Sequence, residues 1–205
     1  MQNHESTCVV ANSPISTRSR MTNYHRMHVP GVTWFFTVNL AERRSRLLVE
    51  RIDTLREALR YVHARHPFRI EAMAVLPDHL HAVWTLPPGD ADYAMRLRLM
   101  KSWFSRHIPA GECRRASRID KGERGIWQRR YWEHMVRDER GLERCVDYVH
   151  FNPVKHGHAA RTADWPHSTF HRFVAKGWLP ADWGVAADYS GSFGERDNPQ
   201  VSQDP

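Results

Sequence analysis

The stretch 70-IEAMAVLPDHLHAVWTL-86 decides the fold, because it places two short apolar runs on either side of Pro77-Asp78. The alternation from Ile70 to Leu76 predicts a strand, and a proline followed by an aspartate is typical of a tight turn. The run His79–Leu86 predicts a second strand that returns beside the first one. We therefore expect an antiparallel hairpin at the centre of the chain.

Outside this hairpin, strand and helix patterns alternate. Val32–Leu40 is β-branched and aromatic and predicts a buried strand, and Tyr131–Val136 predicts a short one. Apolar residues at helical spacing predict helices over Asp53–Ala64, Asp92–His107 and Arg140–Asn152. The order is β-α-β-β-α-β followed by a helix. This order predicts an α+β protein with a ferredoxin-like core, helices on one face of its sheet and an added C-terminal helix.

Composition limits the classes of partner. The 205 residues contain 30 Lys and Arg against 23 Asp and Glu, a net charge of +7, which favours a polyanion such as DNA or RNA. A membrane role is disfavoured, since no run approaches the roughly 18 apolar residues of a spanning helix. Three widely spaced cysteines (Cys8, Cys113 and Cys145) form neither a metal knuckle nor a disulfide framework. We therefore expect a cytoplasmic protein.

The chain divides by composition into one folded domain and two tails. Residues 1–21 and 190–205 are polar and lack periodicity, so we expect both to be disordered. Met21 is a second candidate for the first residue. The domain is expected over 22–160, with an extension over 161–189 that packs on or near the functional residues.

Two histidines on one predicted strand are candidate metal ligands. His79 and His81 stand at i and i+2 and therefore point to the same face, while Leu80 points to the opposite one. Their Cα atoms are about 7 Å apart, so both imidazoles can turn towards one ion. The alternative is a chance spacing, because the chain has 14 histidines.

The predicted C-terminal helix carries a tyrosine and an amide on one face. Tyr148 and Asn152 stand at i and i+4. The amide oxygen can complete a metal site that two imidazoles begin, and the phenol can then face a phosphorus atom bound there. Spacing alone favours the alternative, an ordinary half-buried helix aromatic. Pro153 is expected to end or kink the helix at Asn152.

Five blocks of sequence, taken together, resemble one family. They are GVTWFFTVNL (31–40), VLPDHLHAVWTLPPGD (75–90), IWQRRYWEHMVRD (126–138), DYVHFNPVKHG (147–157) and DWPHSTFHR (164–172). In this order they resemble the REP-associated tyrosine transposases, bacterial relatives of the single-tyrosine HUH transposases. The resemblance extends over about residues 22 to 185, which is nearly everything outside the tails.

The resemblance implies a role for each matching residue. His79 and His81 match the metal ligands, Tyr148 the single catalytic tyrosine, and Asn152 a position from which relatives supply a third, polar ligand. The implied activity is metal-dependent cleavage and rejoining of single-stranded DNA, through a 5′-phosphotyrosine link and a free 3′-OH. The implied cofactor is Mg²⁺ or Mn²⁺, although two imidazoles and an amide suit Zn, Fe or Mn better than Mg.

The implied partner is a single-stranded DNA hairpin formed by a repeated extragenic palindrome. Basic side chains in predicted loops are candidates for phosphate contacts. They are Arg43, Arg44, Arg46, Arg114, Arg115, Arg118, Arg129, Arg130 and Lys155. The block 164–172 either contacts DNA or packs the C-terminal segment on the domain. We expect a monomer, with a dimer as the alternative.

Two other functions compete with the transesterase. The first is a non-catalytic binder of structured single-stranded DNA or RNA, in which only the basic surface matters. The second is a metal-dependent nuclease that uses water in place of Tyr148.

Overall fold

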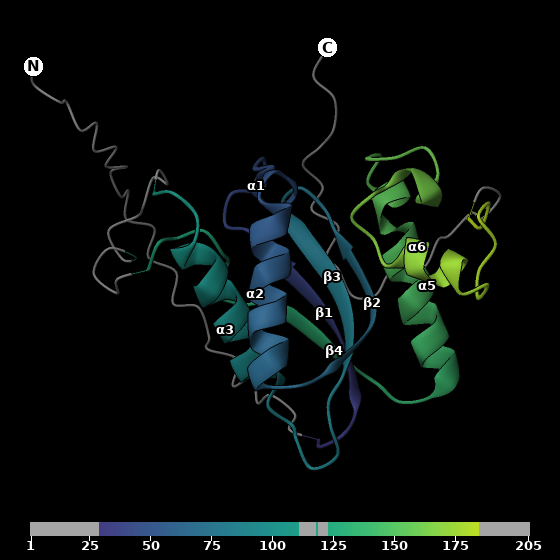
Figure 1. The fold of residues 1–205 in the computed structure, drawn as a ribbon, viewed down its shortest axis with the longest axis horizontal. Coiled ribbons are helices and arrows are strands. Elements are labelled where there is room, and N and C mark those ends of the chain that lie inside the picture. The colour runs from purple at the N-terminus through teal and green to yellow at the C-terminus, as the bar shows by residue number, and fades with distance from the viewer. Residues whose placement is uncertain (1–28, 111–117, 119–122, 185–205) are drawn as a thin grey trace, which may run out of the picture.

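A four-stranded antiparallel sheet forms the centre of the computed structural model, which describes residues 29–110, 118 and 123–184 (Figure 1). The sheet order is β2-β3-β1-β4, the order of a ferredoxin-like core, so the predicted fold class is confirmed. The strands are β1 (Thr33–Asn39), β2 (Arg69–Val75), β3 (His79–Thr85) and β4 (Trp132–Val136). The tails expected over 1–21 and 190–205 lie outside the described residues, as do Cys8, Cys113, Arg114 and Arg115.

The three predicted helices are present in the predicted order, with three short additions: a single turn before the first long helix, and a 3-10 turn and a short helix after the last one. They are α1 (Leu47–Glu50), α2 (Ile52–Arg65), α3 (Tyr93–Arg106), α5 (Glu139–Lys155) and α6 (Phe170–Ala175), with a 3-10 turn η1 (Thr162–Asp164). Within the described part of the chain, none of these helices combines the length and the hydrophobicity needed to cross a bilayer.

Helices cover both faces of the sheet, which corrects the expectation that they lie on one face. Figure 1 shows α2 and α3 on one side of the sheet and α5 on the other. The second face also needs a cover, because the inward side chains of Phe35, Ala72 and Val83 are apolar there and pack with Cys145 and Val149 of α5. The two faces therefore have separate cores.

The helix α5 continues past the proline that was expected to end or kink it. Pro153 lies within α5, which runs to Lys155, and the prediction of an end at Asn152 was wrong. Only the last turn follows the proline, so the helix loses one backbone donor where few hydrogen bonds remain to be made. The amide N–H of His156 donates to the carbonyl of Asn152 at 3.0 Å and closes that turn. The extra turn brings His156 to the end of the helix.

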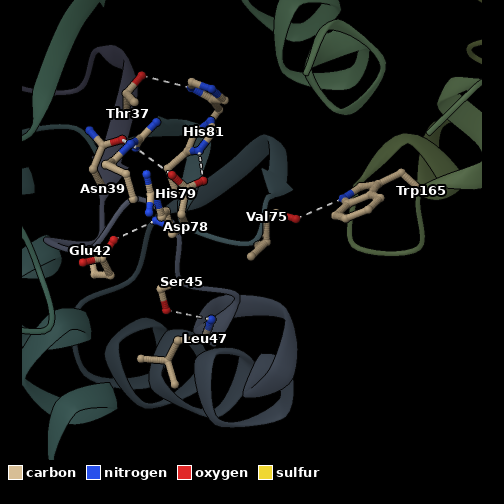
Figure 2. Close-up of polar contacts among 12 residues, drawn as sticks. Thr37, Asn39, Glu42, Ser45, Leu47, Val75, Asp78, His79, His81 and Trp165 are labelled. Atoms are coloured by element: carbon tan, nitrogen blue, oxygen red, sulfur yellow. Dashed lines mark hydrogen bonds and ion pairs between the residues drawn. The ribbon is translucent and has the colours of Figure 1, made fainter. Parts of the chain in front are cut away.

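The C-terminal block 164–172 packs against the edge strand β2. Ser168 forms a β-bridge with Ala74, and the Thr169 amide donates to the Met73 carbonyl at 2.8 Å. The Trp165 indole N–H donates to the Val75 carbonyl at 2.9 Å (Figure 2). These bonds use backbone groups that an edge strand otherwise leaves open. Of the two roles expected for this block, packing is the one that the structure shows.

Candidate metal and tyrosine site

His79 and His81 lie on the same face of β3, as their spacing predicts. Both side chains are buried, and Leu80 points into the opposite core. The two rings are nearly perpendicular, at 85°, with centroids 4.9 Å apart. Their face is the one that α5 covers, since the His81 ring also contacts Phe35 and Tyr148.

A second layer of hydrogen bonds holds each imidazole (Figure 2). Nδ1 of His81 lies 2.9 Å from the Thr37 hydroxyl, and Nδ1 of His79 lies 2.7 Å from a carboxylate oxygen of Asp78. Asp78 is in turn paired with Arg43 at 3.0 Å. Metal-binding histidines typically use their second ring nitrogen in this way, which fixes the tautomer and the ring orientation. The Nε2 atom of His79 is buried and has no hydrogen-bond partner among the residues that the structure describes.

The electrostatics keep one imidazole neutral and one carboxylate charged. Burial, together with the neighbouring His79 and His156, lowers the pKa of His81 well below its ordinary value. Burial opposes ionisation of Asp78, but its hydrogen bond to His79 and the positive charge of Arg43 outweigh that effect and lower its pKa. A neutral imidazole is the form that binds a metal ion.

A third histidine, His156, joins the pair from the end of α5. The ligand nitrogens of His79, His81 and His156 all lie within 4.8 Å of one another. His156 was not among the metal ligands predicted from the sequence. The spacing of His156 could have indicated this role, because it stands four residues after Asn152 and eight after Tyr148. In a helix that continues past the proline, these three positions share one face.

Asn152 and Tyr148 lie on the buried face of α5. The side chain of Asn152 is fully buried beside His81, where it partly offsets the lowering of the His81 pKa, but neither of its polar atoms makes a hydrogen bond of regular geometry. Tyr148 is 1% exposed. Its ring centroid is 5.4 Å from that of His81, and its hydroxyl is 3.5 Å from the ammonium of Lys155.

This donor set fits a divalent metal ion. Buried polar atoms without good partners are costly in a folded protein, and among the described residues neither the His79 Nε2 nor the Asn152 amide makes a regular hydrogen bond. Imidazole nitrogens and amide oxygens are groups that can bind a metal ion, and imidazole is suited to Zn, Cu, Fe and Ni. The arrangement therefore offers a metal site with a phenol beside it.

The described basic candidates separate into three groups. Arg43 and Lys155 belong to the site, through Asp78 and Tyr148 respectively. Arg44, Arg46 and Arg130 are exposed. Away from the site, Arg129 pairs with Glu123 at 2.9 Å, and Arg118 donates to the Trp127 carbonyl at 3.0 Å, so these two stabilise the segment before β4.

The chain is similar to known proteins over most of its length. The family described as "Transposase IS200 like" matches residues 33–152, from β1 to Asn152. The chain is 45% identical over 177 residues to the REP-associated tyrosine transposase of Escherichia coli (strain K12), covering 86% of this chain and 98% of that relative.

A solved structure described as a REP-associated tyrosine transposase bound to a REP hairpin is also similar. It is 43% identical, with a TM-score of 0.70, and the match covers 84% of this chain and 98% of that one. The family match covers all four strands and α5 as far as Asn152. The chain therefore belongs to the IS200-like transposases and, within them, to the REP-associated tyrosine transposases.

Proposed function

We propose that this transposase cleaves and rejoins single-stranded DNA next to a REP-type hairpin, with Tyr148 as the nucleophile. The observation that carries the proposal is the contact between the Tyr148 ring and His81, at 5.4 Å, within reach of a three-histidine cluster. The partner is supported by a relative, because the solved structure with 43% identity is described as bound to a REP hairpin.

His79 and His81 would hold a divalent metal ion together with Asn152, His156 or both. When bound, such an ion polarises the scissile phosphate as a Lewis acid and orients it. Asp78 and Thr37 keep the two strand imidazoles in place through their Nδ1 atoms. Because imidazoles dominate the donor set, we expect Mn²⁺ to sustain at least as much cleavage as Mg²⁺.

The tyrosine supplies the covalent step. The phenol oxygen of Tyr148 forms a bond to phosphorus, and the bond from phosphorus to the 3′-oxygen breaks. The phenol proton is released, and the leaving 3′-oxygen gains a proton. The product is a 5′-phosphotyrosine link and a free 3′-OH, and attack by a 3′-OH reverses the step. Lys155, whose ammonium lies 3.5 Å from the phenol oxygen, favours the negative charge that develops there.

The burial of Tyr148 sets a condition on this mechanism. At 1% exposure the phenol cannot reach a phosphate until the groups that cover it move aside. The same burial is the observation that favours the second candidate function, a non-catalytic binder of structured single-stranded DNA or RNA. An assay for a covalent adduct separates the two.

The assay mixes the full chain with a labelled REP-type hairpin oligonucleotide and Mn²⁺, followed by denaturing electrophoresis. We expect an adduct with the wild type and none with Tyr148→Phe, whose DNA affinity stays nearly unchanged. Tyr93→Phe is the matched control, because Tyr93 is also a fully buried tyrosine but lies in the core of the opposite face. Cleavage that persists in Tyr148→Phe would favour hydrolysis by water, and binding without cleavage by the wild type would favour the binder.

Titration with Mn²⁺ tests whether Asn152, His156 or both bind the metal ion together with His79 and His81. The paramagnetic signal of free Mn²⁺ gives its affinity for the wild type, Asn152→Ala and His156→Ala. We expect at least about a tenfold loss for each residue that is a ligand. His63→Ala is the control, an exposed histidine on α2. A variant with wild-type affinity excludes its residue from the metal site.

We propose that the exposed side chains of Arg44 and Arg46 contact DNA phosphates. We also propose that the protein acts as a monomer. Arg44 and Arg46 follow β1, and removing either is expected to weaken binding at low salt and to reduce the salt dependence by about one phosphate contact. Sedimentation of the free and the DNA-bound chain tests the monomer, and a dimer in both states would contradict it.

A further inference from the structure

A row of aromatic rings leads away from the proposed metal site. The His79 ring is 5.1 Å from His156 between centroids, and His156 is 6.3 Å from His158 with the two planes only 24° apart. The His158 ring in turn lies 5.6 Å from Trp165 at 32°. Neighbouring rings are thus in contact or nearly so, from a buried histidine on β3 to the C-terminal block.

The outer members of the row are accessible and held in place. His156 and His158 are exposed, and Trp165 is half-buried. The Trp165 indole is held by its hydrogen bond to the Val75 carbonyl on β2 (Figure 2), and the His158 backbone N–H donates to the Pro153 carbonyl at 2.8 Å. Rigid aromatic faces with an open side lose little conformational entropy when a flat ligand stacks on them.

Positive charge lies beside the row. Arg46 is exposed at the start of α1, and the proposed function assigns it to a phosphate contact. Lys155 stands next to His156 in the chain and is exposed. Basic side chains that follow a backbone, next to aromatic faces that stack bases, are the combination used to bind single strands. Paired bases are already stacked on both sides, so the row suits an unpaired nucleotide.

We propose that His158 and Trp165 form a stacking platform for an unpaired nucleotide adjacent to the scissile phosphate. The inference rests on the proposed function, because a strand whose phosphate lies at His79 and His81 passes along the row that begins there. The platform would hold the strand on one side of the cleavage point, and Arg46 would contact its backbone.

A double-mutant cycle between protein and DNA tests the platform. The full chain carrying Tyr148→Phe, which binds without cleaving, is titrated with a REP-type hairpin oligonucleotide that has unpaired nucleotides on both sides of its foot. His158→Ala is expected to weaken binding about fivefold to tenfold. An abasic residue at one of the two positions flanking the scissile phosphate should weaken binding of the parent by a similar factor, and should weaken the His158→Ala protein little further.

A matched control separates stacking from a general loss of histidine. His107 is also exposed and stacks on a tryptophan, Trp103, with centroids 3.6 Å apart, but it follows α3 on the opposite face of the sheet. His107→Ala should bind like the parent. The proposal is overturned if the effects of His158→Ala and of every flanking abasic residue are independent, or if His107→Ala loses as much affinity as His158→Ala. Failure of the proposed function is recognised separately, by a wild type that forms no adduct.

Discussion

The two faces of the sheet differ in what they bury. The face under α2 and α3 holds a continuous apolar core rich in large aromatic rings, including Trp34, Phe36 and Trp84. The face under α5 holds a smaller apolar cluster, and next to it lie His79, His81 and other buried polar groups. One sheet thus separates a face with a large apolar core from a face that carries the proposed metal ligands and the proposed nucleophile.

The difference shows how a small domain can tolerate buried polar groups that reduce its stability. Buried imidazole and amide atoms without partners reduce stability, and a large apolar core on the other face offsets that cost. A buried charge occurs on the aromatic face as well, but there Arg96 is fully paired, with Asp90 at 2.6 Å and with backbone carbonyls. The aromatic face also buries the indole N–H groups of Trp34 and Trp84 without hydrogen-bond partners among the described residues, so unsatisfied groups alone do not distinguish the two faces. The α5 face differs because its histidine nitrogens, which can bind a metal ion, lie close to one another.

The largest expected effect comes from a substitution in the aromatic core under α2 and α3. Phe36 is fully buried and contacts Trp84 and Tyr93. Phe36→Ala should lower the free energy of unfolding by about 3–5 kcal/mol, because it leaves a cavity between well-packed rings. Denaturant unfolding measures the loss. Cleavage per folded molecule should stay near the wild-type value, and a comparable loss of intrinsic activity would show that the two faces are not separable.

The next largest effect is expected from a substitution on the face under α5. His81→Ala removes a proposed metal ligand that touches Tyr148. We expect the rate of adduct formation to fall by roughly 10²- to 10³-fold, since the phosphate loses most of its electrostatic stabilisation. Single-turnover kinetics measure the rate. The midpoint of unfolding should change less than in Phe36→Ala, and the reverse order of stabilities would contradict the comparison.

A third prediction concerns pH and the support of α5. Burial, with smaller contributions from Arg172 and His171, lowers the pKa of His150 to about 3, and its Nε2 lies 3.0 Å from the Thr169 hydroxyl. The unfolded chain takes up this proton below about pH 6.5 and the native state only near pH 3, so stability is lost as the pH falls between these values.

The measurement compares the wild type with His150→Gln. Between pH 7 and pH 4 the wild type should lose about 3 kcal/mol more than the variant, which cannot titrate at this position. Chemical denaturation at each pH gives the two curves. Parallel curves would mean that His150 is protonated in the native state at pH 4.

The smallest expected effect comes from a pair of matched substitutions, one on each face of the sheet. Asp78→Asn weakens the partner of His79, and we expect a 10- to 100-fold loss of Mn²⁺ affinity. Asp90→Asn weakens the partner of Arg96 and should lower stability without changing metal affinity. Calorimetric titration with Mn²⁺ measures the metal affinity of each variant. Equal metal affinities in the two variants would remove Asp78 from the support of the site.

Much of the fold was predictable because its signals are local. The alternation in 70–86 depends only on which neighbouring side chains share a face of a strand, and it correctly predicted β2, β3 and the shared orientation of His79 and His81. The common face of Tyr148 and Asn152 follows from helical spacing in the same way. The family was predictable because its blocks keep a fixed order along the chain.

The sequence by itself thus determined the order of the elements and the faces on which the candidate residues stand. Only the tertiary structure decided that α5 covers the face opposite α2 and α3, that α5 continues past Pro153, and that His156 therefore meets the two strand histidines. The physical reason is that periodicity describes one element at a time. The distance between a strand and a helix depends on how their apolar faces pack, and that information is shared among residues far apart in the chain.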